Sequence, residues 1–235
     1  MDSLSKMKTD HLFWLGRYIM RSYTELEAAL VLRDQMLDGK EADYKGFCTR
    51  IGAADIYKDA DDWKKRFFFD EGDPESIASS LSKAYDNAIV CRETISSVAM
   101  SYIQMAISAL EKAENSPSPG VAFQWVFDDL LAFRGCIEEK MVSEYGLDVV
   151  KIGLSLEKLD LSLRLGRPAA RCLFFIQRLE RYASRTGIIY DPVQLTFLKD
   201  ALTLAAQKEE QGIKEAYKDK RQDLIAACEQ LAPGL

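Results

Sequence analysis

The sequence predicts an all-α protein, an up-and-down bundle of helices that forms one domain over residues 1–235. Three observations predict this class. Apolar side chains recur at helical spacing along most of the chain, no segment shows the alternation of a half-buried strand, and Asp-Pro pairs and glycines punctuate the pattern. A composition that is 48% hydrophobic and 29% charged provides for a sizeable core.

The overall composition also argues against several classes of function. A net charge of −6 is unsuited to a general role on nucleic acids or anionic membranes, so neither is expected as a partner. The opening sequence, MDSLSKMKTD, lacks the apolar core of a signal peptide. No apolar run approaches the ~20 residues that a membrane span needs. We therefore expect a cytoplasmic protein.

Cysteine and histidine are too sparse to suggest a metal centre. The five cysteines are scattered without a Cys-x-x-Cys pair, which predicts reduced, partly buried thiols. His11 is the single histidine, so the Glu-x-x-His pairs of di-iron bundles do not occur in the sequence. We expect no metal and no cofactor. We also expect the tryptophans Trp14, Trp63 and Trp125 to be core residues.

The first predicted helix carries the densest pattern in the chain. It starts near Asp10, which suits an N-cap, and stops before Gly39. One face is an apolar stripe of Leu12, Leu15, Ile19, Leu26 and Leu30. The opposite face carries Trp14, Arg17, Tyr18, Arg21 and Glu25. We expect both faces to be covered, so the arginines need carboxylate partners, because an unpaired buried charge is very costly.

Two short helices, at 44–51 and 54–68, are expected to precede a long one. Asp73-Pro74 is an N-cap followed by proline at the first helical position. The segment that follows has a heptad seam, which predicts one helix of ~38 residues and ~57 Å. The seam comprises Ile77, Leu81, Ala84, Ala88, Cys91, Ile95, Val98, Tyr102, Met105 and Ala109. Two interpretations are open: a core helix of an intramolecular bundle, or a coiled coil that joins a homodimer.

A loop rich in proline and serine, at 115–120, separates predicted halves of 1–115 and 121–235. The second half is expected to contain helices at 121–143, 147–165, 168–185 and 193–231. Gly212 is expected to bend or split the last of them.

A segment of the first half is similar in sequence to a segment of the second half. Residues 14–21 align with residues 151–158, which places Gly16 on Gly153. The similarity indicates a diverged internal two-fold repeat. Chance matching between leucine-rich helices is the alternative explanation.

Charged residues on the two aligned segments predict a polar centre. Arg17, Arg21 and Glu25 follow one another at i, i+4 and i+8, and Glu157 and Asp160 lie on the second helix. Because repeat-related helices often pack together, we expect Arg17 or Arg21 to bind Glu157 or Asp160. Arginine suits this role because its planar guanidinium binds a carboxylate bidentately.

Three interpretations of this polar centre are open. It is a buried ion-pair network that fixes helix register, an anion-binding pocket for a phosphate or a peptide carboxylate, or an exposed surface feature. Arg92, on the predicted long helix, either joins the centre or lies on an exposed polar face.

The signature of the first helix, LFWLGRYIMR at residues 12–21, resembles that of the bacterial alpha-E domain family, an all-helical group defined by a Glu-Arg motif. Residues 73–96 also resemble that family's second helical element. More weakly, residues 153–160 resemble its second Gly-Arg-Tyr-x-Glu-Arg element. The residues that match the first two elements include Trp14, Gly16, Arg17, Tyr18, Arg21, Asn87, Arg92 and Ser96.

The chain departs from the family pattern at the motif itself. Met20 stands where the family has the glutamate of its first Glu-Arg pair. In the second element, Leu154 and Lys158 stand where the family has arginine.

The resemblance implies a setting more than a reaction, since alpha-E proteins are typically encoded beside ATP-grasp enzymes that form amide bonds and beside transglutaminase-like peptidases. It therefore predicts a non-catalytic accessory or scaffold protein whose partner is an ATP-grasp ligase or a transglutaminase-like protein. Two alternatives are open. One is an enzyme of peptide-like metabolite synthesis with an arginine–carboxylate polar centre, and the other is a coiled-coil dimerisation module.

Overall fold

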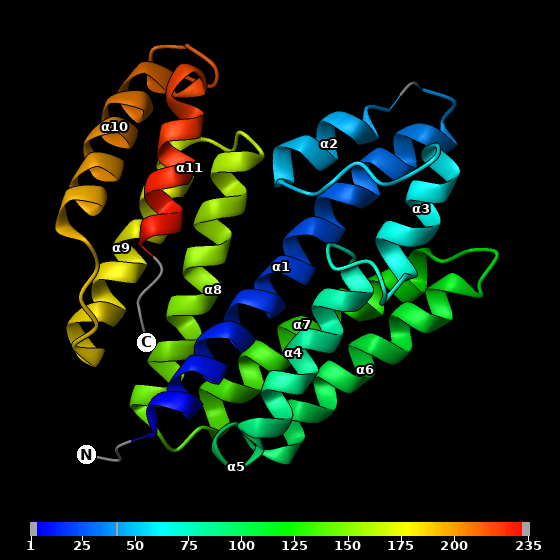
Figure 1. Cartoon of the computed structure of the whole chain (residues 1–235), viewed down its shortest axis with the longest axis horizontal. Coiled ribbons are helices and arrows are strands. Elements are labelled where there is room, and N and C mark those ends of the chain that lie inside the picture. Colours follow the sequence, from blue (N-terminus) through cyan, green and yellow to red (C-terminus); the bar gives the residue numbers. More distant parts are fainter. Residues whose placement is uncertain (1–3, 41, 232–235) are drawn as a thin grey trace.

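The structure, a computed structural model, describes residues 4–40 and 42–231. This part of the chain forms eleven α helices and one short 3₁₀ helix, with no strand, which confirms the all-α prediction (Figure 1). The helices are α1 (Lys6–Leu37), α2 (Tyr44–Ile51), α3 (Ala60–Phe69), α4 (Ile77–Val90), α5 (Arg92–Ile95), α6 (Ser97–Glu114), α7 (Gly120–Lys140), α8 (Glu144–Arg164), α9 (Ala169–Thr186), α10 (Pro192–Glu210), η1 (Lys218–Lys220) and α11 (Arg221–Gln230).

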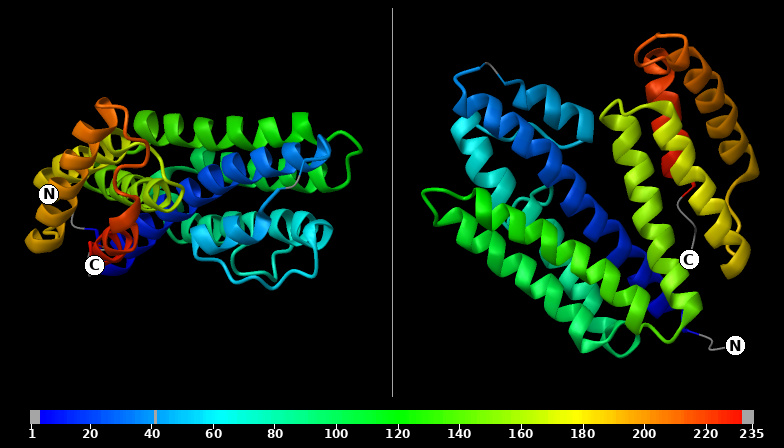
Figure 2. Two further views of the ribbon diagram at one scale, coloured as in Figure 1. Left: turned by 90° about the horizontal axis from the view of Figure 1, so that it is seen from above. Right: turned by 180° about the vertical axis from the view of Figure 1, so that it is seen from behind.

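Helix α1 is the element around which the others are arranged. It has 32 residues and packs against α4 in the first half and against α8 in the second. Seen from above, it runs between the α6–α7 pair and the α2–α3 segment (Figure 2). It starts earlier than Asp10, because the Ser5 side chain caps it by accepting a hydrogen bond from the Lys8 N–H.

The long helix of the structure is α1, and the prediction of a continuous helix after Asp73-Pro74 is wrong. That segment is divided into α4, α5 and α6, with breaks at Cys91 and Ser96. Ser96 has a φ of 77°, which no helix interior tolerates, and its hydroxyl caps α6 by accepting from the Ala99 N–H. The chain reverses there, so α6 packs against α4 (Figure 1).

The heptad seam also changes register at this break. The buried residues of α6 include Ala99, Ile103 and Ala106, which lie outside the predicted seam. Of the predicted seam residues in this helix, Ala109 is buried, while Val98 and Met105 are 55% and 51% exposed. The spacing looked continuous because two amphipathic helices of similar period are joined by a short turn.

The other helices lie close to their predicted positions. Helix α2 matches the predicted 44–51 segment, whereas α3 starts later than residue 54, because Asp59 caps it by accepting from the Asp61 and Asp62 N–H groups. Gly212, with a φ of 92°, follows α10 and separates it from α11, so the predicted split is present.

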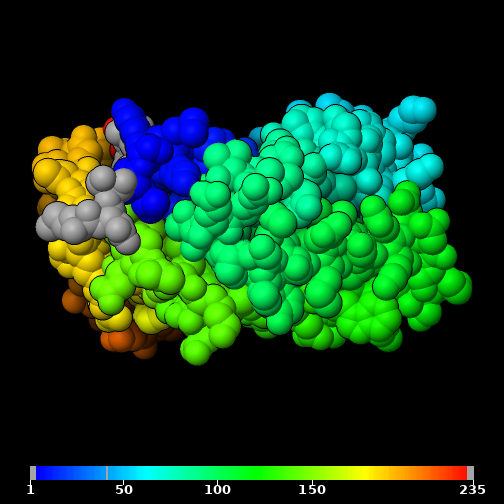
Figure 3. All heavy atoms as spheres, turned by 90° about the horizontal axis from the view of Figure 1, so that it is seen from below, coloured from blue at the N-terminus to red at the C-terminus, as the bar shows by residue number. Residues whose placement is uncertain are grey.

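The helices form two packed groups that share the α1–α8 contact. Helix α7 packs along α6, and α6 packs on α4, while α9 packs on α8 and α10 on α9. Helix α11 closes the second group by packing on both α8 and α10. From below, the start of α1 lies at the surface where the two groups meet (Figure 3). No helix in the described ranges is both long and apolar enough to cross a membrane.

The tryptophans divide between the core and the surface. Trp63 is fully buried among Phe47, Phe67 and Phe68, as expected. Trp14 and Trp125 are 37% and 47% exposed, which contradicts the prediction that all three are core residues.

Candidate functional site

Helices α1 and α8 touch backbone to backbone, and this crossing organises the candidate site. A Cβ on Gly16 would collide with the Val150 carbonyl oxygen and lie 3.0 Å from the Leu154 nitrogen. A Cβ on Gly153 would collide with the Phe13 carbonyl oxygen and lie 3.0 Å from the Arg17 nitrogen. Glycine at both positions lets the helices approach this closely.

The contacts at the crossing are reciprocal. Phe13, Gly16 and Arg17 correspond to Val150, Gly153 and Leu154 at the offset that aligned residues 14–21 with 151–158. The local two-fold relation suggested by the sequence is therefore present at the crossing. It also makes the Met20-Arg21 and Glu157-Lys158 pairs equivalent.

On one side of the crossing, Arg17 and Arg21 bind the same carboxylate. The Nε of Arg17 donates to Oε2 of Glu157, and the Nε of Arg21 donates to Oε1 at 2.7 Å. The Glu157 side chain is fully buried, while the two arginine side chains are 11% and 24% exposed. Although burial lowers it, the charges of Glu157 and Glu25 raise the pKa of Arg21 above its usual value. This side is a closed ion-pair centre.

Glu25 lies one turn beyond Arg21 and does not share its ion pair. It is buried, and its Oε2 accepts no hydrogen bond within the part of the chain described. Burial raises the pKa of Glu25 to about 8, against the lowering charge of Arg21 and with the further raising charges of Glu157 and Glu75. The carboxyl is therefore mostly protonated at pH 7.

Asp160 belongs to the same buried region but has another partner. It accepts from Arg164 of its own helix at 2.9 Å, and Arg164 also binds Glu229 of α11 at 2.6 Å. Burial raises the pKa of Asp160, and Arg164 opposes that rise. The expected contact of the α1 arginines with α8 is therefore made through Glu157. Asp160 instead binds Arg164, and it is Arg164 that links α8 to α11.

The remaining predicted residues of the long segment lie outside the ion-pair centre. Arg92 is exposed on α5 and forms no ion pair within residues 4–40 and 42–231, so it does not join the centre. Asn87 holds His11, with 2.8 Å between Oδ1 and the ring Nδ1. Ser96 is the cap of α6. These residues stabilise helix ends and contacts between helices.

Trp14 and Tyr18 form the outer edge of the ion-pair centre. Their ring centroids are 5.7 Å apart, the Arg17 guanidinium lies 5.8 Å from the Trp14 ring, and that of Arg21 lies 5.6 Å from the Tyr18 ring. These cation–π contacts help to hold both guanidinium groups in place beside Glu157.

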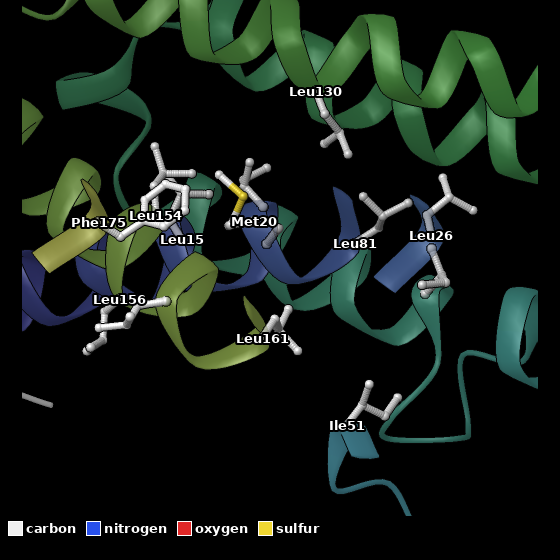
Figure 4. Close-up of a cluster of buried hydrophobic side chains, with 14 of the residues drawn as sticks. Leu15, Met20, Leu26, Ile51, Leu81, Leu130, Leu154, Leu156, Leu161 and Phe175 are labelled. Atoms are coloured by element: carbon white, nitrogen blue, oxygen red, sulfur yellow. The ribbon is translucent and has the colours of Figure 1, made fainter. Parts of the chain in front are cut away.

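The equivalent side of the crossing is apolar where the first side is charged. Met20 stands in place of Glu157 and Leu154 in place of Arg17, and both lie in a cluster of buried hydrophobic side chains with Phe175 (Figure 4). Lys158, the equivalent of Arg21, has no glutamate at the Met20 position to bind. It donates instead to the Thr24 hydroxyl at 3.0 Å, with Glu27 at 3.8 Å.

A cleft of about 240 Å³ lies on this apolar side, and sequence reasoning missed it. Its basic lining residues are Lys158 from α8, Arg134 from α7, and Arg171 and Arg178 from α9. The spacing of Arg171 and Arg178, seven residues apart on one helix, indicates a common face. Their convergence with α7 and α8 could not be predicted because it depends on the packing of three helices.

Metal-ligating groups and cysteine thiols are the other side chains that could carry chemistry. No cluster of histidine, cysteine and acidic residues within the described residues could hold a metal ion. Burial raises the pKa of the Cys91 thiol to about 11 and those of Cys48 and Cys172 to about 12, so these thiols stay protonated and unreactive. A groove of about 560 Å³ between α6 and α7, beside Met105 and Trp125, contains none of the predicted site residues.

Comparison with known proteins places these motifs in one family. No curated protein and no solved structure matches the chain. Residues 4–191, most of the chain, match the model of the Alpha-E family, described as a predicted alpha-helical domain with a conserved ER motif. The match spans both helices of the crossing and the two positions, 20–21 and 157–158, that each keep one half of a Glu-Arg pair. The chain belongs to the Alpha-E family.

Proposed function

We propose that this protein is a non-catalytic helical accessory or scaffold protein that serves an ATP-grasp-type ligase forming peptide or amide bonds. The observation that carries the proposal is the state of the Glu157 carboxylate. It is fully buried and both of its oxygens are bound by arginines, so it has no free oxygen to accept a proton from a substrate.

The alternative of an enzyme centred on these arginines lacks a reacting group. An acyl or amide transfer needs a nucleophile or a base within hydrogen-bond reach of the substrate. The one histidine is bound to Asn87, and the acidic neighbour Glu25 is buried, so a substrate has no access to its carboxyl. The ion pairs are instead suited to holding α1 and α8 in one register.

The alternative of a coiled-coil dimerisation module loses its main support in the fold. The predicted seam is divided between α4 and α6, and their buried residues pack against α1, α7 and each other. Part of the predicted seam is covered within the chain, and the exposed seam residues Val98 and Met105 lie on α6 alone. Within the described residues, no continuous heptad surface is therefore left to bind a second copy.

The experiment that tests the proposal is affinity purification of the chain from its native cell, with partners identified by mass. We expect an ATP-grasp ligase to be recovered, or a transglutaminase-like protein of the same system. A matched purification with Gly153→Ala, which disrupts the crossing, is expected to lose the partner. Recovery of neither class of partner, or amide-bond formation by the isolated chain, contradicts the proposal.

A further inference from the structure

The cleft on the apolar side of the α1–α8 crossing has an excess of positive charge. It brings together four cationic side chains, Arg134, Lys158, Arg171 and Arg178, from three helices. Glu27 is the one carboxylate among its lining residues. The chain as a whole has a net charge of −6, so this concentration of cations runs against its composition.

The arginines of this cleft are not engaged in ion pairs with carboxylates of the described residues. Arg134, Arg171 and Arg178 form no ion pair within residues 4–40 and 42–231. The Glu27 carboxylate forms long ion pairs with two residues. Its Oε2 lies 3.8 Å from the Lys158 Nζ and 3.7 Å from a guanidinium nitrogen of Arg167. Burial lowers the pKa of Arg134, and the charge of Arg178 lowers it further. Cations held together without counter-charge are stabilised when an anion binds between them.

Two of the basic groups are held in fixed orientations before any ligand arrives. Arg178 donates two hydrogen bonds to the Tyr182 hydroxyl, at 2.8 and 3.2 Å, and lies over the rings of Tyr182 and Phe174 at 5.7 Å from each centroid. Lys158 is 7% exposed and is held by Thr24. Preorganised donors bind an anion with less loss of side-chain entropy.

A second, smaller cavity of about 90 Å³ shares Glu27, Lys158 and Arg171 with the cleft. Ser162 lines it, is 1% exposed, and its hydroxyl has no hydrogen-bond partner within the described part of the chain. A buried hydroxyl without a partner costs folding free energy, so its presence beside these cations is explained if it binds a ligand.

We infer that this cleft binds a small organic dianion, a phosphate monoester or a dicarboxylate, whose aromatic or aliphatic part packs against Phe174, Phe175 and Met20. A dianion suits the charge balance, because four cations facing one carboxylate leave an excess greater than a single negative charge cancels. The apolar half of the lining suits a hydrocarbon group, and the volume limits the ligand to a small molecule.

This inference is independent of the proposed function, since it concerns the opposite side of the crossing from the closed ion-pair centre. Lys158 keeps its charge unneutralised from this side because Met20, and not a carboxylate, stands at the equivalent of the Glu157 position. Arg21, the equivalent of Lys158, meets such a carboxylate in Glu157.

Isothermal titration calorimetry on the full chain tests the inference with three probes: phenyl phosphate, phenylsuccinate and the neutral benzyl alcohol. We expect one or both dianions to bind saturably, more weakly at high salt, and benzyl alcohol not to bind. Binding of phenyl phosphate alone identifies a phosphate ester as the ligand class, and binding of phenylsuccinate alone identifies a dicarboxylate. Equal binding of benzyl alcohol, or no saturable binding of either dianion, overturns the inference.

Matched variants locate the binding. Arg171→Gln and Arg178→Gln are each expected to weaken binding by about tenfold or more, because each removes a charge-assisted hydrogen bond. Arg92→Gln is the control, since Arg92 is also unpaired and exposed but lies on α5, outside the cleft. Circular dichroism checks that each variant is folded. Equal weakening by Arg92→Gln would show general charge attraction and overturn the site.

Discussion

The two sides of the α1–α8 crossing share one backbone geometry and differ in what they contain. On one side Arg17 and Arg21 converge on Glu157, and the centre is closed. On the equivalent side Met20 and Leu154 are apolar, and Lys158 lies beside a cleft lined by three further arginines. The first copy of the motif keeps its arginine and the second keeps its glutamate. The comparison indicates that the same crossing holds a closed ion pair where a carboxylate is present, and leaves basic side chains unneutralised where it is absent.

The crossing itself is common to both sides, so disrupting it has the largest expected effect. Gly16→Ala or Gly153→Ala places a Cβ against the backbone of the facing helix, which must move away. We expect each to lower the free energy of unfolding by about 3 kcal/mol or more, at the upper end for overpacking because the colliding atoms are backbone. The measurement is urea denaturation. Gly135→Ala is the control, because a Cβ there meets nothing within 4 Å, and it is expected to stabilise α7 by up to ~1 kcal/mol. Equal behaviour of the three variants would refute a close crossing.

The closed side depends on the buried carboxylate. Glu157→Gln leaves Arg17 and Arg21 without a counter-charge, and we expect a loss of about 3 kcal/mol of unfolding free energy. This value is at the lower end of the losses seen when a buried ion pair is broken, because both guanidinium groups are partly exposed to solvent. Arg21→Gln should cost less, since Arg17 still neutralises Glu157. An unchanged stability of Glu157→Gln in chemical denaturation would contradict a structural role for the pair.

Glu25 gives the closed side a dependence on pH. Its folded pKa of about 8 lies above the unfolded value of 4.5, so the folded state holds the extra proton between these values. The contribution of Glu25 to stability is therefore complete below pH 4.5 and falls by at most ~1.4 kcal/mol per pH unit up to about pH 8. Glu25→Gln should remove this decline. The measurement is the difference in unfolding free energy between variant and native protein at pH 5 and pH 8, and a difference that does not grow with pH contradicts the account.

Replacing Lys158, on the open side, is expected to change the free energy of unfolding least. Burial lowers its pKa from 10.5 to about 8, against the charge of Glu27, so the unfolded state holds more protons between these values. Its unfavourable contribution is present below pH 8 and is relieved as the pH rises towards 10.5. Lys158→Met should raise stability by on the order of 1 kcal/mol at pH 7 and remove that alkaline rise. A loss of stability in thermal melts at pH 7 would show that Lys158 has a partner that this account lacks.

Much of the fold followed from the sequence, because it depends on local signals. The helix start at Asp191-Pro192 and the split at Gly212 reflect capping and backbone preferences that single residues carry. The start predicted at Asp73-Pro74 is wrong, because α4 begins at Ile77, where the Ser76 hydroxyl caps it by accepting from the Ser79 N–H. The break at Ser96 was missed for a physical reason. Serine has no strong preference for a φ of 77°, and the tertiary packing of α6 on α4 imposes it.

One part of the candidate site could be predicted from the sequence, and another part could not. The pairing of Arg17 and Arg21 with Glu157 could be predicted because the similarity around Gly16 and Gly153 brought the two helices together. The basic cleft could not, because Arg134 and Arg171 come from helices whose orientation no local pattern fixes. Asp160 was expected as an alternative partner of the arginines, but it lies one turn along α8 and binds Arg164 instead.

If the absence of a glutamate at position 20 leaves the basic residues of the second side unneutralised, Met20→Glu should neutralise them. The new carboxylate lies beside Lys158 in the cleft, as Glu157 lies beside Arg21, so it should neutralise the basic residues from within. The measurement is calorimetric titration of the native protein, Met20→Glu and the neutral control Met20→Gln with phenyl phosphate and phenylsuccinate. We expect Met20→Glu to weaken dianion binding by tenfold or more, while binding by Met20→Gln stays within about threefold of that by the native protein. Dianion binding that is unchanged in a folded Met20→Glu variant would contradict this expectation.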